Sequence, residues 1–252
     1  MLKAGIIRVS DSPFSSPAML VKKASSGEYR FVVDYRRLNR SLMPTFYPIP
    51  SLEHCFDMIG NDGSTIFCLI DQKAPYHNLK LDESSRRYTA FTTPRGAHYE
   101  FTRLAQGIRS SPTAFITAMS RLLHSDLTTN GVIYLDDLLI FHRTWASQKL
   151  ALASIFHKFR VAKLRINPQK CYFAVGKVIF LGFEVSAEGI KIDPKRFDGV
   201  KSFPAPTNIK ELRRWLGVVG YLRKFLKGFS KITFPLRQLL IQGTPWNWGA
   251  EQ

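Results

Sequence analysis

The 252-residue chain lacks the features that mark several protein classes. Its three cysteines are isolated and odd in number, and they form no zinc-binding spacing, so we expect reduced core residues in an intracellular protein. No stretch approaches the roughly 18 uninterrupted apolar residues of a membrane span. Lys3, Arg8 and Asp11 interrupt the first residues, so we also expect no secretory signal peptide.

Acidic residues are scarce as well. The chain has 19 Asp and Glu against 36 Lys and Arg, which gives a net charge of +17. This excess predicts a polyanionic partner, either nucleic acid or an anionic membrane surface. A ribosomal-type structural protein would share the charge. However, 19 Phe residues and a hydrophobic fraction of 45% indicate a packed globular protein with a real core.

Two adjacent carboxylates interrupt an apolar segment, VIYLDDLLIF, at Asp136 and Asp137. Asp is common in turns, so the pair could simply form the tip of a hairpin. The segment offers no Gly or Asn for the turn, and two neighbouring like charges raise the cost of ionising both. A divalent cation would offset that repulsion, because Mg²⁺ is held by one or two carboxylates together with substrate phosphates.

A third acid, Asp71, ends another apolar segment, IFCLI. A single Asp after a strand is usually a turn or a helix cap. If this strand lies beside the hairpin in one sheet, however, Asp71 meets Asp136 and Asp137. Three carboxylates at one sheet edge would hold two divalent ions roughly 3.5–4 Å apart. Such a site suits in-line phosphoryl transfer, in which positioning and electrostatics supply the catalysis.

The periodicity of the sequence predicts an α+β fold with alternating helices and strands. Ile155, Phe159 and Ala162 can share the buried face of one of the helices. Asn208, followed three residues later by Glu211, predicts a capped helix start. We expect strands at 19–23, 29–34, 64–71, 88–91, 98–101, 132–141 (as a hairpin) and 178–185, and helices at 51–60, 111–123, 147–164 and from 209 onward.

The last part of the chain is distinctly basic. Residues 191–252 contain 12 Lys and Arg against 4 Asp and Glu, a net charge of +8. These charges could form a solvated helical face. A surface that binds a polyanion is an equally good interpretation.

With these features in place, the sequence resembles a known family. Tyr134-Leu-Asp-Asp137 is similar to the Tyr-X-Asp-Asp box of reverse transcriptases. The wider pattern resembles the gypsy-type long-terminal-repeat retrotransposons, in the family's order and over almost the whole chain. The segments that carry the resemblance are DSPFSSP (11–17), YRFVVDYRRLN (29–39), YPIP (47–50), YTAF (88–91), Gln106-Gly107, Ser111-Pro112 and FLGF (180–183).

The resemblance implies a right-hand polymerase fold, with an antiparallel palm sheet packed on helices, β-rich fingers and a helical thumb. It implies an RNA- and DNA-templated DNA polymerase that uses a primed template and deoxynucleoside triphosphates. In a full polyprotein, RNase H and integrase domains would accompany it, in the cytoplasm or in virus-like particles. The implied divisions are 1–50 and 85–105 for the fingers, 51–84 and 106–190 for the palm, and 191–252 for the thumb with the start of a linker to RNase H.

The resemblance also implies roles for individual residues. Asp71, Asp136 and Asp137 match the catalytic triad, which binds two Mg²⁺ ions, with Mn²⁺ as a possible substitute. Lys23 and Arg30 match the cations that grip the incoming triphosphate, although an exposed cationic strand would look the same.

Further matches concern the nucleotide and the primer. Tyr76 matches the aromatic residue beneath the sugar, which would clash with a ribose 2′-hydroxyl, and its alternative is a core aromatic. Gln106 matches a residue near the nucleotide and template. The strand expected to hold the primer end, which could equally be a plain core strand, comprises Phe180, Leu181, Gly182 and Phe183.

The chain departs from the family pattern at several positions. Gln72-Lys-Ala-Pro-Tyr76 replaces a Leu-Arg-Ser-Gly-Tyr-like segment, so Pro75 fixes φ just before Tyr76. Tyr88 stands where the family often has Lys, and Leu104-Ala-Gln-Gly107 replaces Met-Pro-Phe-Gly. These changes keep a second hypothesis open, a catalytically inactive remnant that still binds nucleic acid. A third, an RNA-dependent RNA polymerase, is disfavoured by Tyr76.

Overall fold

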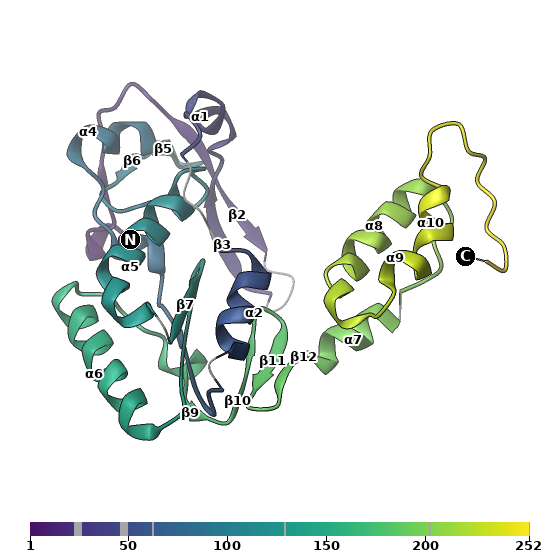
Figure 1. The fold of residues 1–252 in the computed structure, drawn as a ribbon. Helices are drawn as coiled ribbons and strands as arrows, with labels where there is room; N and C mark the ends of the chain where they lie inside the picture. The colour runs from purple at the N-terminus through teal and green to yellow at the C-terminus, as the bar shows by residue number, and fades with distance from the viewer. Residues whose placement is uncertain (23–26, 46–49, 62, 129, 202, 252) are drawn as a thin grey trace. The chain divides into compact units, whose positions relative to one another are not determined.

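The structure, a computed structural model, describes residues 1–22, 27–45, 50–61, 63–128, 130–201 and 203–251 (Figure 1). The chain divides into two compact units, Met1–Gly176 and Lys177–Gln252. Among the described residues, no helix is long and apolar enough to cross a membrane.

One part of the first unit is a five-stranded sheet with the order β1-β6-β5-β2-β3. Its β2–β3 hairpin confirms the strand pair expected around residues 19–34, and all neighbours are antiparallel except β2 and β5. Buried apolar residues, among them Tyr35, Phe91 and Phe101, form the core of this part. The strands are β1 (Ile7–Val9), β2 (Ser16–Lys22), β3 (Tyr29–Val33), β5 (Phe91–Thr92) and β6 (His98–Phe101).

The expected strand at 88–91 is wrong for most of its length, because only Phe91 lies in a strand. The chain instead forms α4 (Glu83–Arg86) and a 3₁₀ turn, η2 (Arg87–Thr89). The Asp82 side chain caps α4 by accepting from the Ser84 N–H. The Thr89 hydroxyl then donates to the Arg86 carbonyl at 2.7 Å. Local side-chain bonds to the backbone thus outweigh the β-propensity of the segment.

The other part of the first unit is a four-stranded antiparallel sheet with the order β7-β8-β4-β9. Two long helices, α5 (Ser111–Leu127) and α6 (Trp145–Val161), pack against one face of it through a shared apolar cluster. The structure confirms these helices, the strand before Asp71 and the hairpin. The strands are β4 (Ile66–Asp71), β7 (Gly131–Tyr134), β8 (Asp137–His142) and β9 (Tyr172–Val175).

Alternation along β4 and β8 divides their side chains between the two faces of this sheet. Cys68, Ile70, Leu138 and Ile140 belong to the cluster with α5 and α6. The intervening residues are buried as well, so both faces are covered. These are Phe67, Leu69, Leu139 and Phe141.

Helix α6 ends three residues earlier than expected. Ile155 and Phe159 are buried as predicted, but Ala162 follows the helix and is exposed. Lys163 has a φ of 56°, and the Leu164 N–H donates to the Phe159 carbonyl at 2.9 Å. This is a Schellman-type end, in which a residue in the left-handed region stops the helix.

Shorter elements complete the first unit. Helix α2 confirms the helix expected at 51–60, and α3 carries Tyr76. They are η1 (Leu2–Ala4), α1 (Arg36–Ser41), α2 (Leu52–Asn61), α3 (Pro75–Asn78) and η3 (Pro168–Lys170).

The second unit joins a three-stranded antiparallel meander to a group of helices. The predicted cap is present, since the Asn208 side chain accepts from the Glu211 N–H at 3.0 Å. Leu212, Leu236 and Leu239 form a small buried core. The elements are β10 (Lys177–Phe180), β11 (Phe183–Ser186), β12 (Gly189–Ile192), α7 (Pro194–Lys201), α8 (Ile209–Gly220), η4 (Arg223–Phe225), α9 (Phe229–Ile232) and α10 (Phe234–Gln238).

The single strand expected at 178–185 is wrong, because the chain reverses between β10 and β11. Phe180 pairs with Phe183, and the two residues between them, Leu181 and Gly182, have φ values of 52° and 77°. Positive φ at both central positions is characteristic of a tight two-residue hairpin turn. An apolar run with one Gly does not distinguish this turn from a continuous strand. The fingers, palm and thumb boundaries stay predictions.

The hydroxyl of Tyr35 offers a test of how the five-stranded part is held together. Tyr35 is 2% exposed, and its hydroxyl donates to the Thr89 carbonyl at 2.7 Å. Tyr35→Phe would leave that carbonyl buried without this partner, so we expect a loss of about 1–3 kcal/mol in the free energy of unfolding. Urea denaturation measures it. Tyr29→Phe, at a 67% exposed position, is the control and should change stability little; equal effects at both positions would refute the assignment.

Candidate active site

The four-stranded sheet brings the three predicted carboxylates close enough to affect one another electrostatically. Asp71 and Asp137 are directly paired residues of the antiparallel β4 and β8 strands. Such pairing sets Cα atoms about 4.5–5.5 Å apart. The expectation that the strand of Asp71 lies beside the hairpin is therefore confirmed. The hairpin tip itself differs, since Leu135 and Asp136 form the turn and Asp137 already belongs to β8.

The turn before the second acid has an unusual backbone. Leu135 has a φ of 54°, in the left-handed region that side chains with a Cβ rarely occupy. A two-residue turn between right-twisted strands needs positive φ, and Gly or Asn normally supplies it. The hairpin thus retains a strained Leu directly beside Asp136, as backbone at functional sites often does.

Alternation also determines which side of the sheet carries the acids. Leu138 and Ile70 point toward α5 and α6, so their neighbours Asp137 and Asp71 emerge on the opposite face. The carboxylates therefore lie outside the main apolar cluster, yet close enough to one another to interact.

Burial and mutual repulsion both act on the hairpin acids. Burial raises the pKa of Asp137, and the charges of Asp71 and Asp136 raise it further, while the nearby Lys170 lowers it. Burial likewise raises the pKa of Asp136, which the Asp71 charge also raises. The site thus disfavours its own ionised state, as expected for like charges that share a confined space.

Tyr76 lies against Asp136 from α3. Its hydroxyl acts as a hydrogen-bond donor that lowers the pKa of Asp136, and its ring lies 5.6 Å from that of Phe115 in the apolar cluster. Pro75 occupies the first turn of α3, where a missing N–H costs nothing. Pro75 is therefore compatible with the helix that carries Tyr76.

One carboxylate oxygen of the site has no hydrogen-bond partner among the described residues. Asp136 Oδ1 is buried and accepts no hydrogen bond within the described structure. Unsatisfied buried oxygens and mutually repelling carboxylates are what a divalent cation would relieve, so the donor set fits Mg²⁺ or Mn²⁺. Among the described residues, no three His, Cys, Asp or Glu side chains converge into a ready-made metal cluster. Phosphate oxygens of a substrate are the usual remaining ligands of Mg²⁺.

Two of the predicted nucleotide-binding residues meet in the structure. Arg30, on β3, donates from Nη2 to Gln106 Oε1 at 2.7 Å, and both residues are exposed. They line a hollow of about 470 Å³. The Asn39 side chain fixes the loop after Gln106 by donating to the Gly107 carbonyl at 2.8 Å. Lys23 lies outside the described residues.

The residues predicted to hold the primer form the β10–β11 turn of the second unit. Phe180 and Phe183 are buried, and the ring of Phe183 stacks 5.0 Å from that of Tyr221. The Tyr221 hydroxyl donates to the Leu181 carbonyl at 2.7 Å. The aromatic residues thus anchor the turn, in which Leu181 and Gly182 are half-buried.

Sequence reasoning missed several residues around the acids. Lys170 acts on Asp137, and the Asn167 N–H donates to the Asp71 carbonyl at 2.9 Å. Both belong to the segment that leads into β9, far from Asp71 in the chain. Only the pairing of β9 with β4 brings them near, and no local pattern signals that pairing.

Comparisons with known proteins agree with this geometry. Residues 21–185 match the family model described as reverse transcriptase (RNA-dependent DNA polymerase). The chain is 36% identical over 248 residues to the retrovirus-related Pol polyprotein from transposon 297 of Drosophila melanogaster, covering 97% of this chain and 23% of that protein. It is also 36% identical to the transposon Tf2-3 polyprotein of Schizosaccharomyces pombe (strain 972 / ATCC 24843), over 100% of this chain and 18% of that protein.

Solved structures give the same result for the fold. The foamy viral protease-reverse transcriptase dRH in complex with double-stranded DNA matches with a TM-score of 0.86 and 26% identity, over 99% of this chain and 44% of that one. The same viral enzyme in complex with an RNA/DNA hybrid matches with a TM-score of 0.80 and 26% identity, over 99% and 33%. The right-hand polymerase fold is thereby confirmed. The chain spans about a quarter or less of the curated relatives.

The raised pKa values of the hairpin acids predict a pH-dependent stability. The folded chain holds these protons more tightly than the unfolded chain, in which an Asp has a pKa of about 3.9. Stability without metal should therefore fall as pH rises from about 4 through the raised values. Asp137→Asn removes one of these charges. We expect this variant to be more stable than wild type at about pH 7 in EDTA, with a difference that shrinks toward about pH 4.

Urea denaturation across this pH range measures the difference. Asp11→Asn, at an exposed position, is the control and should follow wild type throughout. Added Mg²⁺ should stabilise wild type, by about 2.7 kcal/mol at 100 times its Kd, and stabilise Asp137→Asn less. An Asp137→Asn variant that is less stable than wild type in EDTA at about pH 7 would contradict the repulsion argument.

Proposed function

Because the chain belongs to the reverse transcriptases of long-terminal-repeat retrotransposons, we propose that it is the polymerase portion of a Pol polyprotein. It copies RNA and DNA templates into DNA by adding deoxynucleotides to a primer 3′-hydroxyl. The observation that carries the proposal is the pairing of Asp71 with Asp137 beside an unsatisfied oxygen of Asp136.

The three acids would hold two divalent cations in this reaction. Such ions lower the pKa of a primer 3′-hydroxyl and neutralise charge on the transferring phosphate and the departing pyrophosphate. The protein itself contributes a rigid sheet that fixes Asp71 against Asp137. Tyr76, on α3, orients Asp136 through its hydroxyl. We also assign Tyr76 to the sugar of the incoming nucleotide.

Arg30 and Gln106 are the residues we assign to the incoming nucleotide, together with Lys23. A guanidinium donates two parallel hydrogen bonds to phosphate, whereas an ammonium acts as a point charge. The contact between Arg30 and Gln106 supports this assignment, because the amide oxygen orients the guanidinium without neutralising it.

The proposed partners follow from charge and from the structural neighbours. A primed RNA or DNA template suits the net charge of +17, and the matching viral structures contain double-stranded DNA or an RNA/DNA hybrid. Residues 180–183 would hold the primer end, and the basic helices beyond them would follow the duplex backbone. RNase H and integrase domains would accompany this portion, in cytoplasmic virus-like particles.

The inactive remnant is the second candidate function, and the Gln72–Tyr76 segment is the observation that favours it. Ala74 has a φ of 47° and ψ of 58°, so the chain directly before Pro75 is strained. An inactive remnant would still bind primed templates with a steep salt dependence. Turnover therefore distinguishes the two candidates.

Primer extension on an RNA template with deoxynucleotides and Mg²⁺ tests the proposal. We expect product from wild type and a loss of at least about 10³-fold with Asp136→Asn, because the carboxylate that would hold the cation becomes neutral. Asp11→Asn should retain activity. Salt-sensitive binding of primed template without product from wild type would instead establish the remnant, and preferential use of ribonucleotides would indicate an RNA polymerase.

Arg30→Gln tests the nucleotide assignment. Removing a phosphate-binding guanidinium should raise the KM for the deoxynucleotide about tenfold or more and affect the affinity for primed template less. Steady-state primer extension over a range of nucleotide concentrations gives KM, and filter binding gives the template affinity. Arg160→Gln, at an exposed position on α6, is the matched control. A KM equal to that of wild type would remove Arg30 from the nucleotide site.

A further inference from the structure

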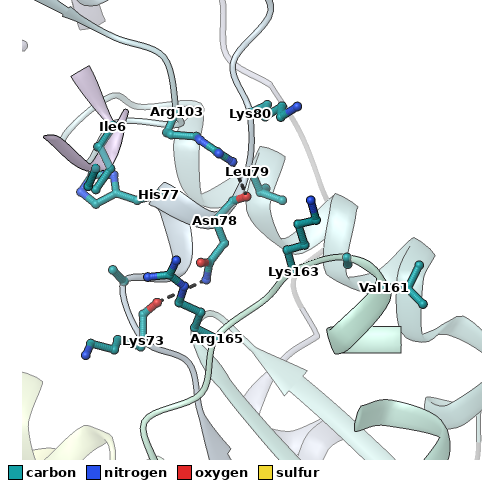
Figure 2. Close-up of a pocket in the computed structure, with 13 residues that line it drawn as sticks. Ile6, Lys73, His77, Asn78, Leu79, Lys80, Arg103, Val161, Lys163 and Arg165 are labelled. Carbon is teal, nitrogen blue, oxygen red and sulfur yellow. Dashed lines mark hydrogen bonds between the residues drawn. The ribbon is translucent and has the colours of Figure 1, made fainter. Parts of the chain in front are cut away.

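A second site lies in the first unit, away from the carboxylates. It is a hollow of about 840 Å³ (Figure 2). Its lining includes the end of α3, Arg103 just after β6, and the end of α6. Tyr76 of α3 interacts with Asp136, whereas the next two residues, His77 and Asn78, line the hollow. None of the three site carboxylates lines it.

The hollow is strongly cationic. Lys73, Lys80, Arg103, Lys163 and Arg165 line it, and the described lining contains no Asp or Glu. None of these five residues forms a salt bridge within the described part of the chain, although seven such pairs occur among the other described residues. Repulsion among clustered cations is costly unless an anion compensates it.

The segments that carry these cations are tied together by hydrogen bonds. The Lys73 N–H donates to the Arg165 carbonyl at 2.8 Å, and Asn78 Nδ2 donates to the Lys73 carbonyl at 3.2 Å. Arg103 Nη1 donates to the Asn78 carbonyl at 3.3 Å. Lys73, Arg103 and Arg165 are therefore presented on a connected framework, and Lys80 joins it through an isolated β-bridge to Arg103.

The backbone is strained at one of these cations. Lys163 occupies the position after the α6 C-cap with a φ of 56°, a conformation that Gly adopts at no steric cost. A Lys there retains about 1 kcal/mol of strain and places an ammonium at the rim of the hollow. Strain kept at a charged pocket points to a role for the side chain.

The spread of the cations indicates the shape of the ligand. In Figure 2 the ammonium groups of Lys73 and Lys80 point away from each other at opposite ends of the hollow, and Arg165 and Lys163 lie between them. Cations spread along a hollow suit a ligand with charges along its own length, and a phosphodiester strand carries one charge per nucleotide. The apolar walls, which include Leu79 and Val161, leave room for sugars or bases.

We propose that this hollow binds a single-stranded segment of nucleic acid through consecutive phosphates, at a site separate from the carboxylates. Single strands are typically held by such a positively charged groove that follows the backbone. The site does not depend on catalysis, so its test contains no divalent cation and no turnover.

Fluorescence anisotropy with labelled oligo(dT) in EDTA measures the binding. The double variant Lys163→Gly/Arg165→Gln should bind about five- to tenfold more weakly and lower the slope of log affinity against log salt by about 1.4, since each lost contact to a single strand removes about 0.7. Lys149→Gln, an exposed cation on α6 outside the hollow, should change affinity less than about twofold. A loss of log affinity per removed charge that is equal in the two proteins would mean that only net charge matters, which overturns the proposal.

Two further measurements separate this site from misfolding and from other ligands. Lys163→Gly alone should weaken binding while leaving the melting temperature unchanged or higher, because Gly relieves the strain; a lower melting temperature with unchanged affinity would make Lys163 structural. Oligo(dT) should protect Lys73, Lys80 and Lys163, but not Lys149, from acetylation. Absence of that protection, or equal protection by deoxythymidine triphosphate alone, would refute a nucleic-acid strand as the ligand.

Discussion

The pairing of β4 with β8 is the constraint on which the rest of the site depends. It joins Asp71 to Asp137 across the centre of a four-stranded sheet, where Ile70 and Leu138 are buried on the other face. A one-residue slip of either strand would turn its carboxylate into the apolar cluster and its neighbouring apolar residue to the opposite face. The core packing on α5 and α6 therefore holds the acids together against a repulsion that would otherwise separate them.

That repulsion gives the site its chemical character. The raised pKa values of Asp136 and Asp137 show that the fold tolerates a locally unfavourable charge arrangement, which a cation would relieve. The chain as a whole carries an excess of positive charge, with a net charge of +17. A polyanion attracted by the net charge of the molecule thus meets one small acidic region in it. Divalent cations would neutralise the repulsion between the polyanion and these carboxylates.

The sequence predicted what depends on local periodicity. The strand before Asp71, the hairpin at 131–142 and helices α5 and α6 all follow from alternation or helical spacing, and the structure contains them. It did not predict the turn at Leu181 and Gly182 or the end of α6 at Lys163, because in each a non-glycine residue adopts positive φ. Residues with a Cβ rarely adopt that conformation, so a Leu or a Lys in the sequence does not predict a turn. Contacts in the folded protein impose the turn all the same. Lys170 and Arg165 were missed for another reason, because only long-range pairing brings them near Asp137 and Lys73.

Three of the strained positions share one property, which is that each redirects the chain at a place where side chains converge. Leu135 turns the hairpin at Asp136, Ala74 precedes Tyr76, and Leu181 forms the turn that Tyr221 anchors. Each costs about 1–3 kcal/mol, and a fold keeps such costs only when the surrounding packing fixes the backbone. Ala74 also lines the cationic hollow, as do His77 and Asn78 of the helix that holds Tyr76 against Asp136. The segment from Asp71 to Asn78 therefore contributes residues to both the acidic site and the basic hollow.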